Sequence, residues 1–246
     1  MAMNALWKLT WTEAKLFLRE PAAVFFTLLF PLLLLLIFGS IFGNAPIGDT
    51  GFGSVDRSVP GYIAIMIGAL SLIGVPITLA TYREKGILRR FRVTPLPTGL
   101  FLAAHGLVAL MMVLVGTGLV IGTGIALFDL RLPASSLGVV GATVLGSLSF
   151  LALGFLLGGT LPTARTAQAV GMALFFPMLF LSGAALPRML FPDLLMQISL
   201  YFPLTHVVTL IQNVWMGDGW NMVALGVLAG RLAAGAVGSV TLFRWT

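Results

Sequence analysis

Residue types that usually carry chemistry are few in this sequence and widely spaced. It contains no Cys and only two His, His105 and His206, which are too few for a typical zinc site. No segment has the G-x-x-x-x-G-K-[ST] pattern of nucleotide-binding loops or the H-E-x-x-H pattern, and Ser182 is not in a G-x-S-x-G context. The sequence therefore predicts a chain that is not an enzyme and binds no cofactor of its own.

The one dense group of charges lies in the segment 82–97. If its first part is a helix, Glu84, Ile87 and Phe91 share one face with Leu88, and basic residues surround that face. Pro95 and Pro97 end the helix. A basic loop on anionic lipid would explain the charges alone, whereas an apolar ridge with a charged rim also fits a protein partner. The candidate docking residues are Arg83, Glu84, Lys85, Gly86, Ile87, Leu88, Arg89, Arg90, Phe91 and Arg92.

Composition places these residues in a membrane protein. Of 246 residues, 59% are hydrophobic and only 9% are charged, and the mean hydropathy is +1.05. Such a chain has too little polar surface for water, which excludes a soluble domain, a disordered chain and a disulfide scaffold. The net charge of +6 is better explained by basic cytoplasmic loops than by nucleic-acid binding.

Six stretches are long and apolar enough to be transmembrane helices. No core of these stretches holds an acidic residue, and none alternates apolar and polar residues as a membrane barrel strand would. We therefore expect an all-α polytopic membrane protein in a single domain, 1–246. The predicted spans are 22–43, 60–81, 99–128, 135–160, 166–186 and 221–243.

Lys and Arg give the expected orientation. With the N-terminus inside, ten of them fall in inner segments and three in outer loops, a strong bias under the positive-inside rule. Both termini are then cytoplasmic. The inner residues are Lys8, Lys15, Arg19, Arg83, Lys85, Arg89, Arg90, Arg92, Arg165 and Arg244, and the outer ones are Arg57, Arg131 and Arg188.

Two further segments are predicted to be helices that do not cross the membrane. In 1–21, aromatic and basic side chains occupy different faces, which is typical of a helix lying in the membrane interface; an extension of the first span is the alternative. In 187–217, two apolar halves bounded by Pro or Gly are each too short to span, and external re-entrant helices fit them best. The candidate interfacial residues are Trp7, Lys8, Trp11, Lys15 and Arg19.

Charge inside the spans is almost absent. An ion-coupled carrier usually places Asp or Glu near the midplane, and no predicted span core does so. Arg231 is the single charge inside a span, and packing or snorkelling is favoured for it over contact with a substrate. His105 is interpreted as a core or interface histidine.

The segment 82–97 resembles the signature of type-2 ATP-binding-cassette export permeases, in which R-E-x-G is followed by an apolar and basic stretch and then by T-P or S-P. The segments 181–187, 203–206 and 242–245 also resemble this family, so the resemblance covers essentially the whole chain. In size and layout it is similar to small exporters of the daunorubicin-resistance permease type. The short first outer loop, about 44–59, leaves no room for the large external domain of some relatives.

The resemblance implies an export subunit in the plasma membrane of a prokaryote. Two permeases, identical or related, would pair with two copies of a separate ATPase that carries the ATP and Mg. Residues 83–92 would be the coupling helix, with Glu84, Ile87, Leu88 and Phe91 as docking ridge, and 1–21 would be the connecting helix. The cargo would be drug-like, antibiotic or lipid-like, and membrane lipids would be contacts. The alternatives are an ATP-independent carrier and a lipid-modifying membrane protein.

Overall fold

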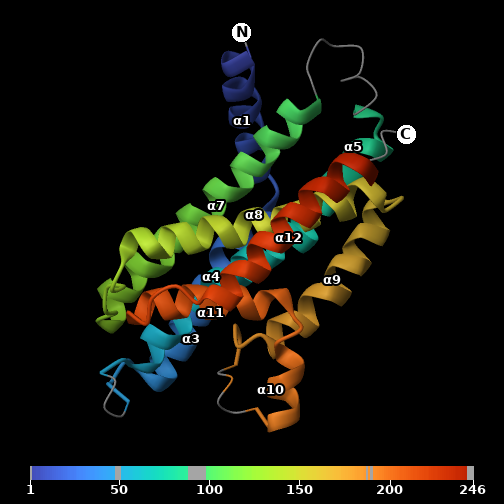
Figure 1. The fold of residues 1–246 in the computed structure, drawn as a ribbon. Coiled ribbons are helices and arrows are strands. Elements are labelled where there is room, and N and C mark those ends of the chain that lie inside the picture. The colour runs from blue at the N-terminus through green and yellow to red at the C-terminus, as the bar shows by residue number, and fades with distance from the viewer. Residues whose placement is uncertain (1, 48–50, 88–97, 187, 189–190, 243–246) are drawn as a thin grey trace.

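The computed structural model describes residues 2–47, 51–87, 98–186, 188 and 191–242, and the regular secondary structure in these ranges is helical. Figure 1 shows one bundle in which α1, the end of α5, the start of α7 and the end of α12 lie at the same end. The elements are α1 (Ala2–Leu18), α2 (Pro21–Val24), η1 (Phe25–Leu29), α3 (Phe30–Phe42), α4 (Ser54–Ala69), η3 (Leu70–Gly74), α5 (Val75–Glu84), α7 (Thr98–Phe128), α8 (Ser136–Thr160), α9 (Ala164–Leu181), α10 (Asp193–Ser199), α11 (Pro203–Met216) and α12 (Met222–Leu242).

Helix lengths confirm the all-α polytopic membrane class. Five segments are long and apolar enough to cross a bilayer, and they lie where the first five spans were expected. Helix α12 occupies the expected place of the sixth, with a shorter apolar stretch, Met222–Gly238. The main difference is at the second span, which begins at Ser54 rather than 60. The five segments are Phe25–Phe42, Ser54–Glu84, Gly99–Phe128, Ser136–Thr160 and Ala164–Leu181.

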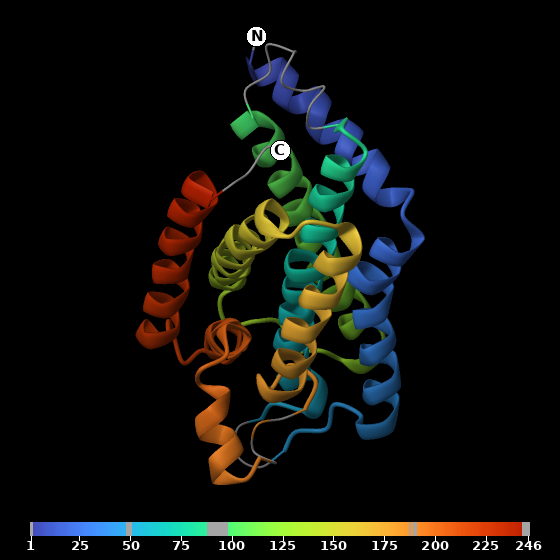
Figure 2. The same ribbon diagram turned by 90° about the vertical axis from the view of Figure 1, so that its right-hand side faces the viewer.

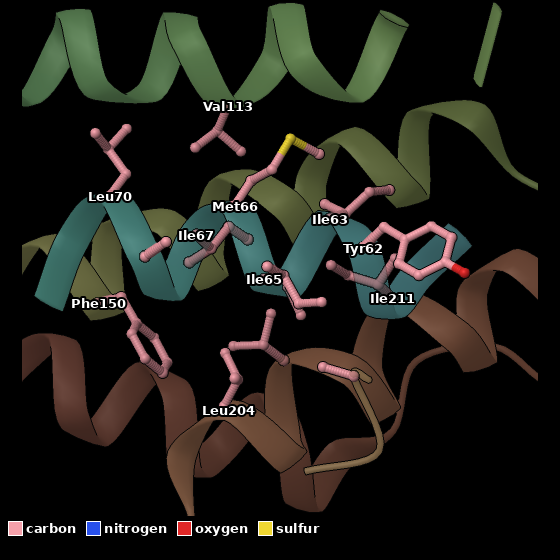
Figure 3. Close-up of a cluster of buried hydrophobic side chains, with 14 of the residues drawn as sticks. Tyr62, Ile63, Ile65, Met66, Ile67, Leu70, Val113, Phe150, Leu204 and Ile211 are labelled. Carbon is pink, nitrogen blue, oxygen red and sulfur yellow. The ribbon is translucent and has the colours of Figure 1, made fainter. Parts of the chain in front are cut away.

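The second span forms the centre of the bundle. Its α4 part is buried on every side, as expected for a helix that is apolar all round. Figure 3 shows Ile63, Met66 and Ile67 of α4 between side chains from three other helices. Those neighbours are Val113 of α7, Phe150 of α8, and Leu204 and Ile211 of α11.

A π-helical turn precedes a proline in each of the first two spans. η1 lies directly before Pro31, and η3 lies directly before Pro76. Proline cannot donate a backbone hydrogen bond, and its ring crowds the carbonyl four residues earlier. A wider turn relieves that crowding, and π turns of this kind are a recognised cause of helix bends. The first two spans are therefore irregular at defined positions.

Neighbouring helices approach the second of these turns closely. A Cβ atom added at Gly154 of α8 would lie 2.1 Å from the carbonyl oxygen of Ser71, and one at Gly171 of α9 would lie 2.3 Å from that of Leu72. Real Cβ atoms do not come so near, so only glycine lets α8 and α9 pack directly on η3. Small residues have this role widely in membrane helix packing.

Helices α10 and α11 do not cross the bundle. They meet at an angle of 94°, and the carbonyl of Trp215 at the end of α11 accepts a hydrogen bond from the Ala134 amide, 3.0 Å away, in the turn between α7 and α8. That turn lies at the same end of the bundle as the end of α9. The α10–α11 pair therefore begins and ends on one side, as a re-entrant element would.

Candidate functional site

Arg83 connects the end of α5 to the end of α8. Its Nη1 donates a hydrogen bond to the carbonyl of Gly159, at 3.1 Å, and α8 ends one residue later at Thr160. The last carbonyls of a helix lack partners within the helix and carry partial negative charge, so a guanidinium is favourable there. The contact fastens α5 to α8.

Glu84 connects the same point of α5 to the start of α9. Its Oε1 accepts a hydrogen bond from the backbone N–H of Ala164, at 3.1 Å, and Ala164 is the first residue of α9. The Thr163 hydroxyl caps the same helix by accepting from the N–H of Thr166 at 3.1 Å. A carboxylate is favourable at a helix N-terminus, where free N–H groups point outward. Arg83 and Glu84 thus form a clamp on the turn between α8 and α9, which we call the α8–α9 clamp.

Helix α5 stops at the clamp. Gly86 has φ of 67°, a left-handed conformation that favours glycine and ends helices. Glu84 therefore belongs to α5 and faces α9, and it is not joined to Ile87 by an unbroken helix as the ridge of 84, 87, 88 and 91 assumed. Lys85 is exposed and Ile87 is half-buried. Leu88, Arg89, Arg90, Phe91 and Arg92 lie outside the described residues, and the docking role of 83–92 stays a prediction.

A second polar contact joins α5 to α1 and α7 just before the clamp. The Tyr82 hydroxyl donates to Oε2 of Glu13 at 3.1 Å, and Nδ1 of His105 lies 3.3 Å from the same oxygen. The Phe101 ring packs against both Tyr82 and His105. Glu13 is only 7% exposed, so its carboxylate is shielded from water and depends on Tyr82 and His105 for its polar contacts. We call Glu13, Tyr82 and His105 the Glu13 node.

Helix α1 packs on the bundle through a face that the sequence did not single out. Thr10 and Glu13 are buried, whereas Trp7 and Trp11 are 67% and 56% exposed. Lys15 lies over the Trp11 ring at 5.1 Å, a cation–π contact. The exposed aromatic and basic residues remain free for lipid, so the interfacial assignment of Trp7, Lys8, Trp11, Lys15 and Arg19 stays a prediction.

Glu13 was not among the residues selected from the sequence. It lies between Thr12 and Ala14, and the aromatic stripe of the same helix is the more hydrophobic one. The signal that could have found it is the spacing of Thr10, Glu13 and Phe17, which fall on one face at i, i+3 and i+7. A carboxylate on the least basic face of a basic helix is a candidate for a specific partner.

Asp56 forms a polar node at the opposite end of the bundle. It is 1% exposed and accepts hydrogen bonds from the N–H of Gly53 at 2.8 Å, the amide of Asn44 at 3.0 Å and the N–H of Arg131 at 2.9 Å. Asn44 also accepts from the N–H of Asp56. One carboxylate thus joins the loop before α4, the start of α4 and the turn after α7. The sequence placed Asp56 in an outer loop, without these partners.

Catalytic or metal chemistry finds no support in these contacts. Among the residues that the structure describes, no three His, Asp or Glu come together as metal ligands would. The cavity beside the Glu13 node has a volume of about 40 Å³, which suits a water molecule or two and not a drug-sized ligand. Instead, a few polar contacts link the end of α5 to the end of α8 and the start of α9. Such contacts suit the passing of a movement from one helix to the others.

The sequence shows the family to which the chain belongs. Residues 4–215 match the ABC-2 type transporter family, and the chain belongs to that family. It is 24% identical to the Daunorubicin resistance ABC transporter permease protein DrrB1 of Streptomyces coeruleorubidus, over 99% of this chain and 87% of the relative. It is 26% identical to the Putative transport permease ycf38 of Porphyra purpurea, over 92% and 79%. It is 24% identical to the Putative transport permease YvfS of Bacillus subtilis, over 83% and 82%.

The chain is therefore a multi-pass membrane permease of the ABC transporter class. It is a transport subunit rather than an enzyme, and its family works with ATPase partners. This confirms the resemblance based on 82–97. Arg83 and Glu84 of the α8–α9 clamp lie within the residues that match the family.

Proposed function

We propose that this chain is the membrane subunit of an ATP-driven exporter for drug-like, antibiotic or lipid-like amphipathic cargo. It acts as a pair of permeases with two copies of a separate ATPase. The family supports an ATPase partner, and one relative is named for daunorubicin resistance. The basic bias of the loops supports cytoplasmic termini, and the relatives from Streptomyces coeruleorubidus and Bacillus subtilis support a prokaryotic plasma membrane.

The observation that carries the mechanism is the α8–α9 clamp. The segment 83–92 would dock on the ATPase, and its first two residues are bonded to the ends of α8 and α9. Tyr82, one residue earlier, is bonded to α1 through Glu13. A displacement of the docked segment would therefore reach α8, α9 and α1 at once. Rigid-body tilting between two packings is a common way for such a displacement to act.

Two substitutions separate docking from transmission. Ile87→Asp places a charge in the proposed docking segment, and we expect less of the ATPase to copurify with the permease. Glu84→Ala removes the contact with α9, where the Glu84 carboxylate is engaged. We expect this variant to retain much more of the ATPase than Ile87→Asp does, while ATP-driven export falls severalfold relative to the ATP hydrolysed. The ATPase for this test is to be sought among the genes that neighbour this one.

Asp218→Ala is the matched control, because Asp218 is an exposed carboxylate at the other end of the bundle. It should leave both association and export unchanged. Normal association and normal export by Ile87→Asp would show that 83–92 does not dock. Export by Glu84→Ala at the wild-type rate per ATP would show that the clamp does not transmit.

A further inference from the structure

A cavity of about 170 Å³ lies between α8, α11 and α12. Figure 2 shows α12 at one edge of the bundle, beside α8 and α11. The polar side chains that line it are Arg231 of α12 and Ser149 of α8, and Pro203 at the start of α11 lies in its wall. The remaining lining is apolar. The cavity is separate from the α8–α9 clamp, the Glu13 node and the Asp56 node.

If α12 crosses the bilayer as the expected sixth span, Arg231 lies deep in the membrane. It is the tenth residue of α12, which puts it about 14 Å along the helix from Met222, near the middle of a bilayer core of about 30 Å. In the described part of the chain, no carboxylate forms an ion pair or hydrogen bond with it. A charge at this depth normally has a partner or a wet cavity. Its partner is therefore to be sought outside the described residues.

The surroundings of the cavity favour an anion. Ser149 is 3% exposed, and its hydroxyl has no hydrogen-bond partner, although a buried hydroxyl is usually bonded. Pro203 begins α11, and the N-terminus of a helix carries partial positive charge. A buried donor, a guanidinium and a helix start thus meet with no acid among them.

We propose that this cavity binds the single anionic group of an amphiphile, such as a phosphate, sulfate or carboxylate, whose apolar chain lies along the lipid-facing side of α8 and α12. Arg231 would pair with the anion, and Ser149 would donate a hydrogen bond to it. Arginine suits this role because its planar fork binds two oxygens at once. The half-exposed position of Arg231 leaves access from the membrane.

Binding is tested on the full chain in detergent by native mass spectrometry, with phosphatidylglycerol and phosphatidylcholine of identical acyl chains. We expect wild type to retain phosphatidylglycerol preferentially and Arg231→Gln to lose about tenfold of that preference. Arg231→Lys should keep part of it. Arg131→Gln is the control for charge, because Arg131 is an exposed arginine in the turn after α7.

Ser149→Ala should reduce the preference by a few fold. Its matched control is Ser147→Ala, because the Ser147 hydroxyl is also buried without a partner on α8 but does not line the cavity. An unchanged preference in both Arg231→Gln and Ser149→Ala, or an equal loss in the controls, would overturn the site. A folded state of each variant is checked by its elution as a single species and its thermal midpoint.

A second measurement distinguishes a resident lipid from cargo. The chain and its ATPase are placed in vesicles with fluorescent phosphatidylglycerol, and dithionite reports the leaflet that holds the label. ATP-dependent transfer that Arg231→Gln abolishes would identify the anion as part of the cargo, whereas retention without transfer would identify a resident lipid. Both results support the site. Because binding needs no ATPase, its failure is separate from failure of the proposed export function.

Discussion

The two ends of the bundle are held together by different kinds of contact. At one end, the buried Asp56 accepts hydrogen bonds from three donors in separate segments. At the other end, Arg83 and Glu84 reach from half-buried or exposed positions to single backbone groups of α8 and α9. Separating buried partners leaves them unsatisfied, which costs more than separating partners that water can replace. We infer that the Asp56 end stays fixed and that, at the other end, the contacts of α5 with α8 and α9 are the ones suited to move, whereas the buried Glu13 node holds α5, α1 and α7 together more firmly.

The largest effect should come from the fixed end. Asp56→Ala leaves three donors without their acceptor, and we expect the stability to fall by about 3 kcal/mol or more. Thermal unfolding of the full chain in detergent measures it. Asp218→Ala should change the midpoint little, and a loss in Asp56→Ala no larger than that of this control would remove the contrast between the two ends.

Packing at η3 should show the next largest effect. Gly171→Ala brings a methyl group against the carbonyl of Leu72, so α9 must shift, and we expect a loss of about 1–3 kcal/mol. Gly118→Ala is the control, because an added methyl group there meets nothing within 4 Å. Equal midpoints for the two variants would show that α9 does not rest on η3 as described.

The Glu13 node should give a smaller loss of stability and a clear loss of coupling. Glu13→Ala removes the acceptor of Tyr82 and the partner of His105, and we expect about 1–2 kcal/mol. Export per ATP should also fall, because α1 is then released from α5. Glu13→Gln retains an oxygen that can accept from Tyr82 and should keep most of both properties. If Glu13→Gln were as damaging as Glu13→Ala, the charge and not the hydrogen bond would be the important feature.

The smallest effect on stability is expected at the clamp itself. Thr163→Ala removes the N-cap of α9 and should cost about 1 kcal/mol, and Glu84→Ala should cost less than that because Glu84 is exposed. The double variant tests whether the two side chains cap α9 independently, in which case their effects on the thermal midpoint add. A loss from Glu84→Ala that rivals that of Asp56→Ala would contradict a movable end.

The spans could be predicted because hydropathy alone determines them. α7, α8 and α12 begin and end within a residue or two of the expected bounds, since an apolar run of about 20 residues has one way to sit in a bilayer. The joints could not be predicted in the same way. Asp56 and Glu13 each bind residues far away in the sequence, and a single carboxylate carries no local sign of its partner. Helical periodicity predicts an unbroken docking helix through Gly86, because periodicity alone does not show that Gly86 is left-handed.

The π turn η3 has a consequence for how the two ends are aligned. It acts as one inserted residue in a helix of 3.6 residues per turn, so everything after it is rotated by about 100° relative to an uninterrupted helix. The direction in which Tyr82, Arg83 and Glu84 point is therefore set by η3 and not only by their own positions. If Leu70–Gly74 became a regular α-helix without losing a residue, the last turn of the span would face away from α1, α8 and α9, whereas deleting one residue from η3 at the same time would restore the phase. The irregularity is thus a phase adjustment that brings the signature residues onto the helices they hold.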